Sequence, residues 1–336
     1  LRVLANCMKI DKFVLAEGTK FYQVIDGILY RIVENGLILE SVPGLKSGEI
    51  VLPDDCIKVW DNSIWLSSNE PCTLIFNPQL EIIESDALNA INVREIVLPN
   101  NAFIYPNALF GTEGLETLVF TGKLKSSDGI INQAGSLKNI IIESSDEIEI
   151  DGVFANAPES INIFTSSPEK NFSYSGECVV YVPGQCADKY ALTRAAEVRE
   201  MWRYNVNRKE GKMEIVPQIE GLEIDKVTIN GKTVQPTSDI YPIEGNTNLD
   251  VKVEYTLLGR QKMTTHYTSE FNENVADAVV TGVQEIIGSG DTLMDVYGID
   301  GMLYLKGCSK EDLNSLKQGV YILRQGNKSR KIVVTK

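Results

Sequence analysis

The sequence has few of the residues that carry most enzyme chemistry. Its 336 residues include one histidine, His266. Catalysis of the Ser-His-Asp or Cys-His type would have to pass through that residue, and a metal site could not use a second histidine. His266 lies between Thr265 and Tyr267 in an alternating run, which favours a half-exposed strand position. The sequence therefore predicts a protein that is not an enzyme.

Cysteine is also scarce. The six cysteines include no CxxC pair, so the spacing of a zinc site is absent, and we expect neither a metal nor another cofactor. Only Cys178 and Cys186 are close in sequence. They either close a small disulfide loop in an exported protein or are buried free thiols, and the sequence leaves both alternatives open.

Long apolar runs and positive charge are missing as well. No run of 18 apolar residues exists, which excludes a transmembrane helix in this chain. The formal net charge of −14 repels nucleic acid and anionic lipid. The first residue is Leu1 rather than Met, so the apparent absence of a signal peptide is uninformative about export.

What the sequence does contain is a repeat between Pro71 and Ile163. Two apolar residues separated by one return at steps of 22, 22, 22 and 21 residues: Leu74 and Phe76, Ile96 and Leu98, Leu118 and Phe120, Ile140 and Ile142, Ile161 and Ile163. A small residue followed by an apolar pair precedes the last three, at 108–110, 129–131 and 152–154. A period near 22 residues is typical of leucine-rich repeats, in which stacked units supply one another's core.

Outside the repeat, the sequence predicts antiparallel β-structure. Asp26-Gly27 lies between two alternating apolar runs and predicts a tight hairpin, as does Asn230-Gly231. Alternation with period 2 from Ile215 to Phe271 predicts an antiparallel sandwich. Apolar pieces between Val296 and Val334 predict another small β unit.

Three phrases resemble known families. The run F-Y-Q-V-I-D-G-I-L-Y from Phe21 to Tyr30, followed by I-x-L-P strands, resembles the BspA-type leucine-rich repeats of bacterial surface proteins. The phrase V-V-Y-V-P-G from Val179 to Gly184 is similar to the segment that closes such arrays. The ending G-V-Y-I-L, then K-I-V-V, is similar to the C-terminal sorting domain of type IX secretion substrates.

These resemblances imply a mainly β protein that is exported, either to the cell surface and outer membrane or as a secreted protein. They imply a BspA-like leucine-rich repeat solenoid over residues 1–210, an Ig-like β-sandwich over 215–272 and a small C-terminal β-sandwich module of the sorting type over 282–336.

The repeat strands also present a candidate binding face. The residues beside each buried pair point outward, so that Ile75, Val97, Val119 and Ile141 form an apolar ladder flanked by Thr117 and Thr121. If another part of the chain covers this ladder, it belongs to the core; if it is open, it is a surface for a partner. Four aromatic residues of the return segments either add anchors for sugar or protein or pack in the core, namely Trp60, Trp65, Phe103 and Tyr105.

An acidic cluster follows one repeat strand and consists of Glu143, Asp146, Glu147, Glu149 and Asp151. Two carboxylates hydrolyse glycosides when they lie roughly 5 to 10 Å apart in a cleft. Solvated carboxylates on a solenoid surface only keep it soluble. Oxygen-rich loops also suit calcium, but no EF-hand spacing is present.

Together these patterns predict a non-catalytic surface or secreted protein that binds or adheres to a host or extracellular-matrix protein, or to a glycan. The alternative is a structural spacer or assembly component of the cell envelope with no specific ligand. The sequence gives no oligomeric state.

Overall fold

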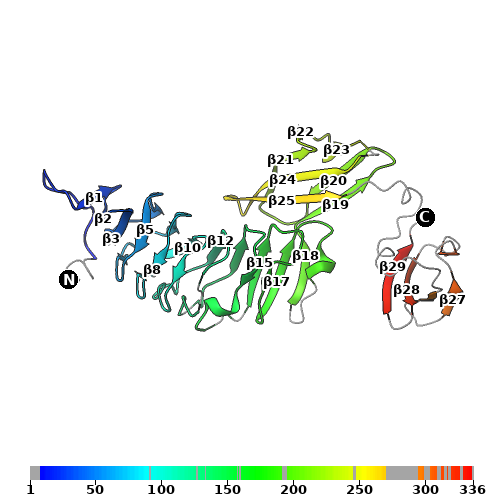
Figure 1. The fold of residues 1–336 in the computed structure, drawn as a ribbon, viewed down its shortest axis with the longest axis horizontal. Coiled ribbons are helices and arrows are strands. Elements are labelled where there is room, and N and C mark those ends of the chain that lie inside the picture. The colour runs from blue at the N-terminus through cyan, green and yellow to red at the C-terminus, as the bar shows by residue number, and fades with distance from the viewer. Residues whose placement is uncertain are drawn as a thin grey trace. The chain divides into compact units, whose positions relative to one another are not determined.

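The computed structural model describes residues 8–90, 92–125, 128–132, 134–156, 158, 160–190, 195–244, 247–269, 294–298, 303–308, 312–313, 316, 319–325 and 328–334. The chain is mainly β-structure (Figure 1) and divides into two compact units, Leu1–Gly245 with Leu249–Ser269 and Asn246–Asn248 with Glu270–Lys336. No helix in these ranges is long and apolar enough to cross a membrane.

The first unit begins with a six-stranded sheet in the order β1-β2-β3-β5-β8-β11. Its strands are β1 Tyr22–Ile25, β2 Ile28–Val33, β3 Gly36–Ser41, β5 Cys56–Val59, β8 Ile82–Ile83 and β11 Phe103–Ile104. The first three strands are antiparallel and the rest join in parallel. The predicted hairpin at Asp26-Gly27 is confirmed, with both residues at positive φ, 49° and 76°.

A second sheet of eight parallel strands runs along the repeat in the order β18-β17-β15-β13-β12-β10-β7-β4. Its strands are β4 Gly48–Val51, β7 Cys72–Ile75, β10 Val93–Leu98, β12 Thr117–Phe120, β13 Asn139–Ile142, β15 Ser160–Thr165, β17 Glu177–Val182 and β18 Ala195–Glu200. The apolar pairs of the repeat are all buried in one core. Each strand by itself could not bury that face, so stacking supplies the core.

One step of the repeat differs from the prediction. Ile140 aligns with Ile163 rather than with Ile161, so the structural step is 163 − 140 = 23 residues rather than 21. The position matching Ile142 is therefore Thr165, which is buried. Its hydroxyl donates to Asn171 Oδ1 at 2.9 Å, and this bond lets a polar side chain occupy an apolar position.

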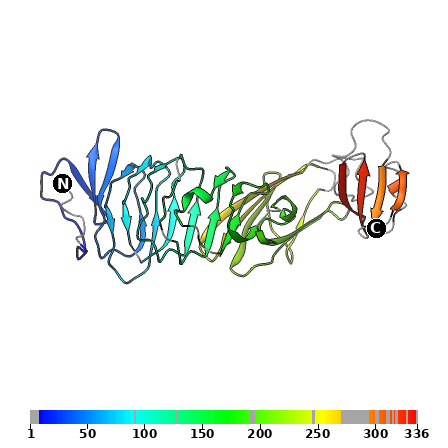
Figure 2. The same ribbon diagram turned by 90° about the horizontal axis from the view of Figure 1, so that it is seen from below.

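Figure 2 shows the strands of the solenoid stacked side by side, and the return segments between them carry further short parallel strands. These are β6 Ile64–Trp65 with β9 Leu88–Asn89, and β14 Ile148–Glu149 with β16 Phe172–Ser173, beside the 3-10 helices η1 Asp151–Val153 and η2 Ala187–Tyr190. The second predicted phrase also stacks, since Leu109 N donates to Ile130 O at 2.9 Å. The result is a β-solenoid of about seven turns.

Two antiparallel sheets complete the first unit. One has the order β19-β20-β23 and the other β22-β21-β24-β25. The strands are β19 Trp202–Asn207, β20 Lys212–Pro217, β21 Leu222–Ile229, β22 Lys232–Val234, β23 Ile240–Pro242, β24 Leu249–Leu257 and β25 Gln261–Ser269. Trp202 and Tyr255, both fully buried, meet edge to face at 4.8 Å in their common core. The Asn230-Gly231 hairpin is confirmed between β21 and β22.

The second unit holds an antiparallel sheet in the order β27-β26-β28-β29. Its strands are β26 Met294–Gly298, β27 Leu303–Cys308, β28 Gly319–Gln325 and β29 Lys328–Val334. Val296 and Leu323 lie at the centre of its small core. The sequence from Asn272 to Thr281, between the two predicted β modules, favours a linker, and these residues lie outside the described ranges.

Candidate binding surface

The predicted apolar ladder exists on the eight-stranded sheet. Val97 aligns with Ile75 on one side and with Val119 on the other, and Val119 aligns with Ile141. The row continues through Val51 at one end and through Phe164 and Tyr181 at the other. Its members share one face because every second residue of a strand points to the same side of the sheet.

The antiparallel sheets β19-β20-β23 and β22-β21-β24-β25, which share a core and which we call the sandwich, cover most of this ladder. Val119, Ile141 and Phe164 are buried in a core that they share with sandwich residues such as Val253 and Met263. Val97 is partly buried against the same core and Ile75 is half-buried, whereas Val51 is 52% exposed. At Val119 and Ile141 the ladder is therefore part of the core between the solenoid sheet and the sandwich, and a partner could not reach these side chains while the sandwich is in place.

The side chains of the two flanking threonines are also engaged within the protein itself. Thr117 is buried, and Thr121 donates its hydroxyl to Leu98 O at 2.8 Å. The six residues of the predicted face thus lie on one sheet in the predicted register, but the side chains at its centre face the protein's own sandwich.

Polar side chains cross the same interface along β25. Thr265 donates to Ser166 O at 2.8 Å and Tyr267 donates to Gly184 O at 3.2 Å. The Arg260 guanidinium pairs with Glu95, and Gln261 donates to Glu143. Burial raises the pKa of both carboxyl groups; Arg260 opposes this at Glu95, and the Gln261 hydrogen bond opposes it at Glu143.

The acidic cluster predicted after β13 does not act as a group. Glu143 faces the sandwich, Asp146 accepts the Lys123 amide at 3.4 Å, and Asp151 accepts from the Ser175 hydroxyl at 2.8 Å. Glu147 and Glu149 are exposed. The two hydrogen-bonded carboxylates of the exposed part, Asp146 and Asp151, therefore have different partners.

An exposed aromatic surface lies instead on the six-stranded sheet. Outward positions of β2, β3, β5, β8 and β11 form a first row of Arg31, Ile38, Lys58, Ile82 and Phe103. A second row consists of Glu40 in β3 and of the residues that directly follow β5, β8 and β11, namely Trp60, Glu84 and Tyr105. We call these two rows the aromatic face. Trp60, Phe103 and Tyr105 are 38%, 40% and 39% exposed.

Three of the four aromatic residues singled out from the sequence therefore share one face. Phe103 and Tyr105 meet edge to face at 5.0 Å between ring centroids. Trp65 lies apart from them in β6 and is half-buried. The sequence does not show which of Trp60 and Trp65 is exposed, because strands this short have no alternation of apolar and polar residues.

The charges of the aromatic face are paired. Arg31 Nε lies 2.6 Å from Glu40 Oε1, and Lys58 pairs with Glu84. Both cations also lie against the Trp60 ring, at 5.1 Å for Arg31 Cζ and 4.4 Å for Lys58 Nζ from its centroid. Such cation–π contacts orient the indole ring. The face is therefore electrically balanced and its central ring is held in place.

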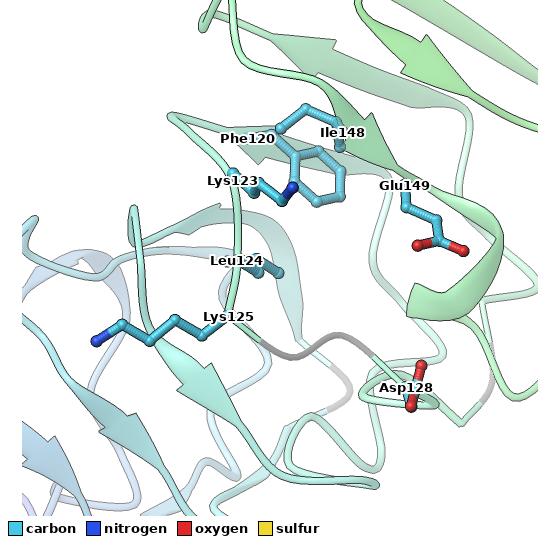
Figure 3. Close-up of a pocket in the computed structure, with 7 residues that line it drawn as sticks. All are labelled: Phe120, Lys123, Leu124, Lys125, Asp128, Ile148 and Glu149. Atoms are coloured by element: carbon cyan, nitrogen blue, oxygen red, sulfur yellow. The ribbon is translucent and has the colours of Figure 1, made fainter.

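A pocket of about 250 Å³ interrupts the solenoid surface one turn further on (Figure 3). Lys125 N donates to Ala102 O at 2.9 Å, which places this turn beside the strand that carries Phe103. The apolar lining is Phe120, Leu124 and Ile148, and the charged lining is Lys123, Lys125, Asp128 and Glu149. In Figure 3 the Lys125 side chain points away from the two carboxylates.

In the described ranges, the side chains suited to redox or metal chemistry do not form a redox or metal site. No three His, Cys, Asp or Glu side chains of the described residues gather as metal ligands would. Five cysteines fall in the described part, among them Cys178 and Cys186, and all five are buried free thiols. Burial raises the pKa of Cys186 to about 11, which suppresses its thiolate. His266 is exposed on β25, with Nε2 2.6 Å from Asp250 Oδ1.

Comparisons with known proteins give little further information. No family model matches the chain, and no curated protein matches it. Among solved structures, the crystal structure of the pneumococcal vaccine antigen PcpA is similar over 49% of this chain and 49% of its own length, at 19% identity and a TM-score of 0.31. A likeness of this size does not define a common fold, and nothing about function follows from it.

Proposed function

We propose that this chain is a non-catalytic binding protein of the cell surface or the extracellular space, and that it contacts a host or matrix protein or a glycan through the aromatic face. One observation carries the proposal. Trp60, Phe103 and Tyr105 are exposed together on one sheet, although large aromatic side chains normally account for much of a protein's buried core.

The physical properties of the aromatic face suit binding. Aromatic and arginine side chains contribute most to binding free energy at protein surfaces. The backbone amides of Trp60 and Tyr105 are hydrogen-bonded to the preceding turn, and the Trp60 ring is held by two cations. Little conformational entropy is then lost when a ligand binds. The apolar ladder of the other sheet cannot supply this surface, because the sandwich occupies its centre.

The architecture is part of the proposal. We assign the solenoid to the BspA-type leucine-rich repeats, the two antiparallel sheets of the first unit to an Ig-like sandwich, and the second unit to a sorting module of the type IX kind. The motifs quoted from the sequence support these assignments, and with them an exported protein.

The test is an array of extracellular-matrix proteins and glycans probed with the intact chain and two variants, Trp60→Ala and Tyr105→Ala. We expect a specific ligand whose binding falls at least about fivefold in each variant, as for truncation of a hot-spot aromatic side chain. Phe110→Ala is the matched control, since Phe110 is 41% exposed but lies outside the aromatic face.

An array without any specific ligand would contradict the proposal and favour the alternative, a structural spacer of the cell envelope. Equal binding by all variants would keep a binding function but place it elsewhere on the chain. Far-ultraviolet circular dichroism and a cooperative urea unfolding transition of each variant establish that the fold is intact.

A further inference from the structure

The aromatic face repeats with a period of two strands. Its first row alternates charged and apolar side chains, from Arg31 and Ile38 to Lys58 and Ile82, and ends at Phe103. Its second row alternates Glu40, Trp60, Glu84 and Tyr105. Neighbouring strands are ~4.8 Å apart, so groups of the same kind recur every ~9.6 Å along the second row, and along the first row as far as Ile82, after which Phe103 breaks the alternation.

A repeating surface is matched by a repeating ligand. In a flat β-1,4-linked glycan, successive sugar rings are turned over, so every second ring presents the same edge and face. Such a ribbon laid across the strands would meet an aromatic ring at one unit and a charged pair at the next. Its C–H faces would cover Phe103 and Tyr105, and its hydroxyl groups would bond to Lys58, Glu84 and Glu40.

The charge balance selects a neutral ligand. Arg31 pairs with Glu40, and Lys58 pairs with Glu84, so the face has no net charge of its own. The whole chain carries −14, which disfavours an anionic glycan. A basic partner would have to compete with the two cations for the carboxylates. Hydroxyl groups can use the same pairs as they stand, because ammonium and guanidinium groups donate and carboxylates accept.

The pocket lies in the turn that follows the strand carrying Phe103, since Lys125 N donates to Ala102 O at 2.9 Å. Its apolar lining by Phe120, Leu124 and Ile148 and its charged rim of two lysines and two acids repeat the chemistry of the face in concave form. The rim is again balanced. A ring at the end of the ribbon would therefore find the same kinds of contact there.

We infer that the aromatic face binds an extended, neutral, β-1,4-linked glycan that runs across β3, β5, β8 and β11 toward the pocket. This inference rests on the proposed binding function and names its ligand class. It requires Phe103 and Tyr105 to stack against sugar rings, and the ion pairs of the face to bond hydroxyl groups without separating.

The test is isothermal titration of the intact chain with defined hexasaccharides. Cellohexaose, chitohexaose and β-1,4-mannohexaose represent the ribbon, and maltohexaose, which is α-linked and curved, represents the same sugar chemistry in a different shape. We expect one β-linked hexasaccharide to bind at least tenfold more tightly than maltohexaose. The affinity should change little between ~0.05 M and ~0.5 M sodium chloride, because no net charge is neutralised.

The variants Phe103→Ala and Tyr105→Ala should each weaken this binding at least about fivefold. Phe110→Ala, which removes an equally exposed ring elsewhere, should leave it unchanged. Equal affinity for maltohexaose, or a β-linked glycan bound equally by all variants, would overturn the inference.

Heparin, hyaluronan and matrix proteins in the same experiment separate the two claims. If heparin, hyaluronan or a matrix protein is the only ligand that binds, and its binding is lost in Tyr105→Ala, the inference of a neutral glycan ligand is overturned. The proposed binding function then stands. If no ligand of any class binds, both fail.

Discussion

At the residue scale, single side chains decide how the solenoid meets the sandwich. Gly184 ends the V-V-Y-V-P-G phrase and lies directly beneath the first sandwich strand. A Cβ at this position would lie 2.5 Å from Trp202 O and 2.6 Å from Tyr204 Cβ. Its own carbonyl accepts from the Tyr267 hydroxyl. The phrase that closes the repeat therefore needs glycine because another strand approaches its backbone.

Glu143 makes the interface sensitive to pH. Burial raises the pKa of Glu143 above the usual 4.5, so its protonated form is favoured in the folded state. The stability from this group is present in full below the unfolded pKa and is lost as the pH rises through the folded pKa. Glu143→Gln removes the charge but keeps an oxygen that can accept from Gln261. We therefore expect it to raise the free energy of unfolding at pH 7, with the gain shrinking toward pH 4.

Urea denaturation at several pH values between 4 and 8 measures this effect. Glu147→Gln is the control, because Glu147 is exposed in the same repeat. Its free energy of unfolding should stay within ~0.5 kcal/mol of the parent chain at every pH. A Glu143→Gln variant that is less stable than the parent at pH 7 would show that the carboxylate stabilises the interface.

At the element scale, equivalent positions of the parallel strands differ according to what covers them. Ile75 on β7 and Ile141 on β13 hold the same place in the ladder, through Val97 and Val119. Ile141 is fully buried under the sandwich and Ile75 is half-buried. The repeat gives Ile75 and Ile141 equivalent positions, and the sandwich makes their burial unequal.

Truncation of these two isoleucines should therefore have unequal effects. Ile141→Ala leaves a cavity between two domains and should lower the free energy of unfolding by ~2 to 5 kcal/mol. Ile75→Ala removes the same atoms from a partly solvated site and should cost less than ~2 kcal/mol. The free energies come from urea denaturation. Equal losses would mean that the sandwich does not bury Ile141 in solution.

At the scale of the whole molecule, solenoid and sandwich form one compact unit. Isolated repeat arrays unfold roughly repeat by repeat, because each repeat contacts only its neighbours. Here β12, β13 and β15 each contribute a side chain to the sandwich core, namely Val119, Ile141 and Phe164. Three repeats are thereby joined through a common partner.

Hydrogen exchange should reveal this coupling. We expect amides of β13 and of β24 to exchange with the same opening free energy, because neither core persists without the other. Ile141→Asp, which buries an unpaired charge at their contact, should lower both opening free energies together. Sandwich amides that open at lower cost while β13 stays protected would contradict a single cooperative unit.

The local and periodic features of the fold can be predicted from the amino-acid sequence alone. The repeat spacing located the buried pairs from Leu74 to Ile142, and the Asp26-Gly27 and Asn230-Gly231 turns located two hairpins. These features depend on residues close in the chain or on a fixed period, which a sequence displays directly. The misplacement at Ile161 arose because Thr165 takes an apolar position through a hydrogen bond to a side chain.

Only the tertiary structure decided which faces remain open. The apolar pattern of Ile75, Val97, Val119 and Ile141 would be the same in the sequence whether or not another part of the chain covered the ladder. Whether the ladder is buried depends on β25, which lies more than a hundred residues later in the chain. Thr265 of β25 donates to Ser166 O across the contact. Exposure of Trp60, Phe103 and Tyr105 likewise depends on the absence of a cover over their sheet among the described residues. Burial between domains is a long-range property, and no local pattern records it.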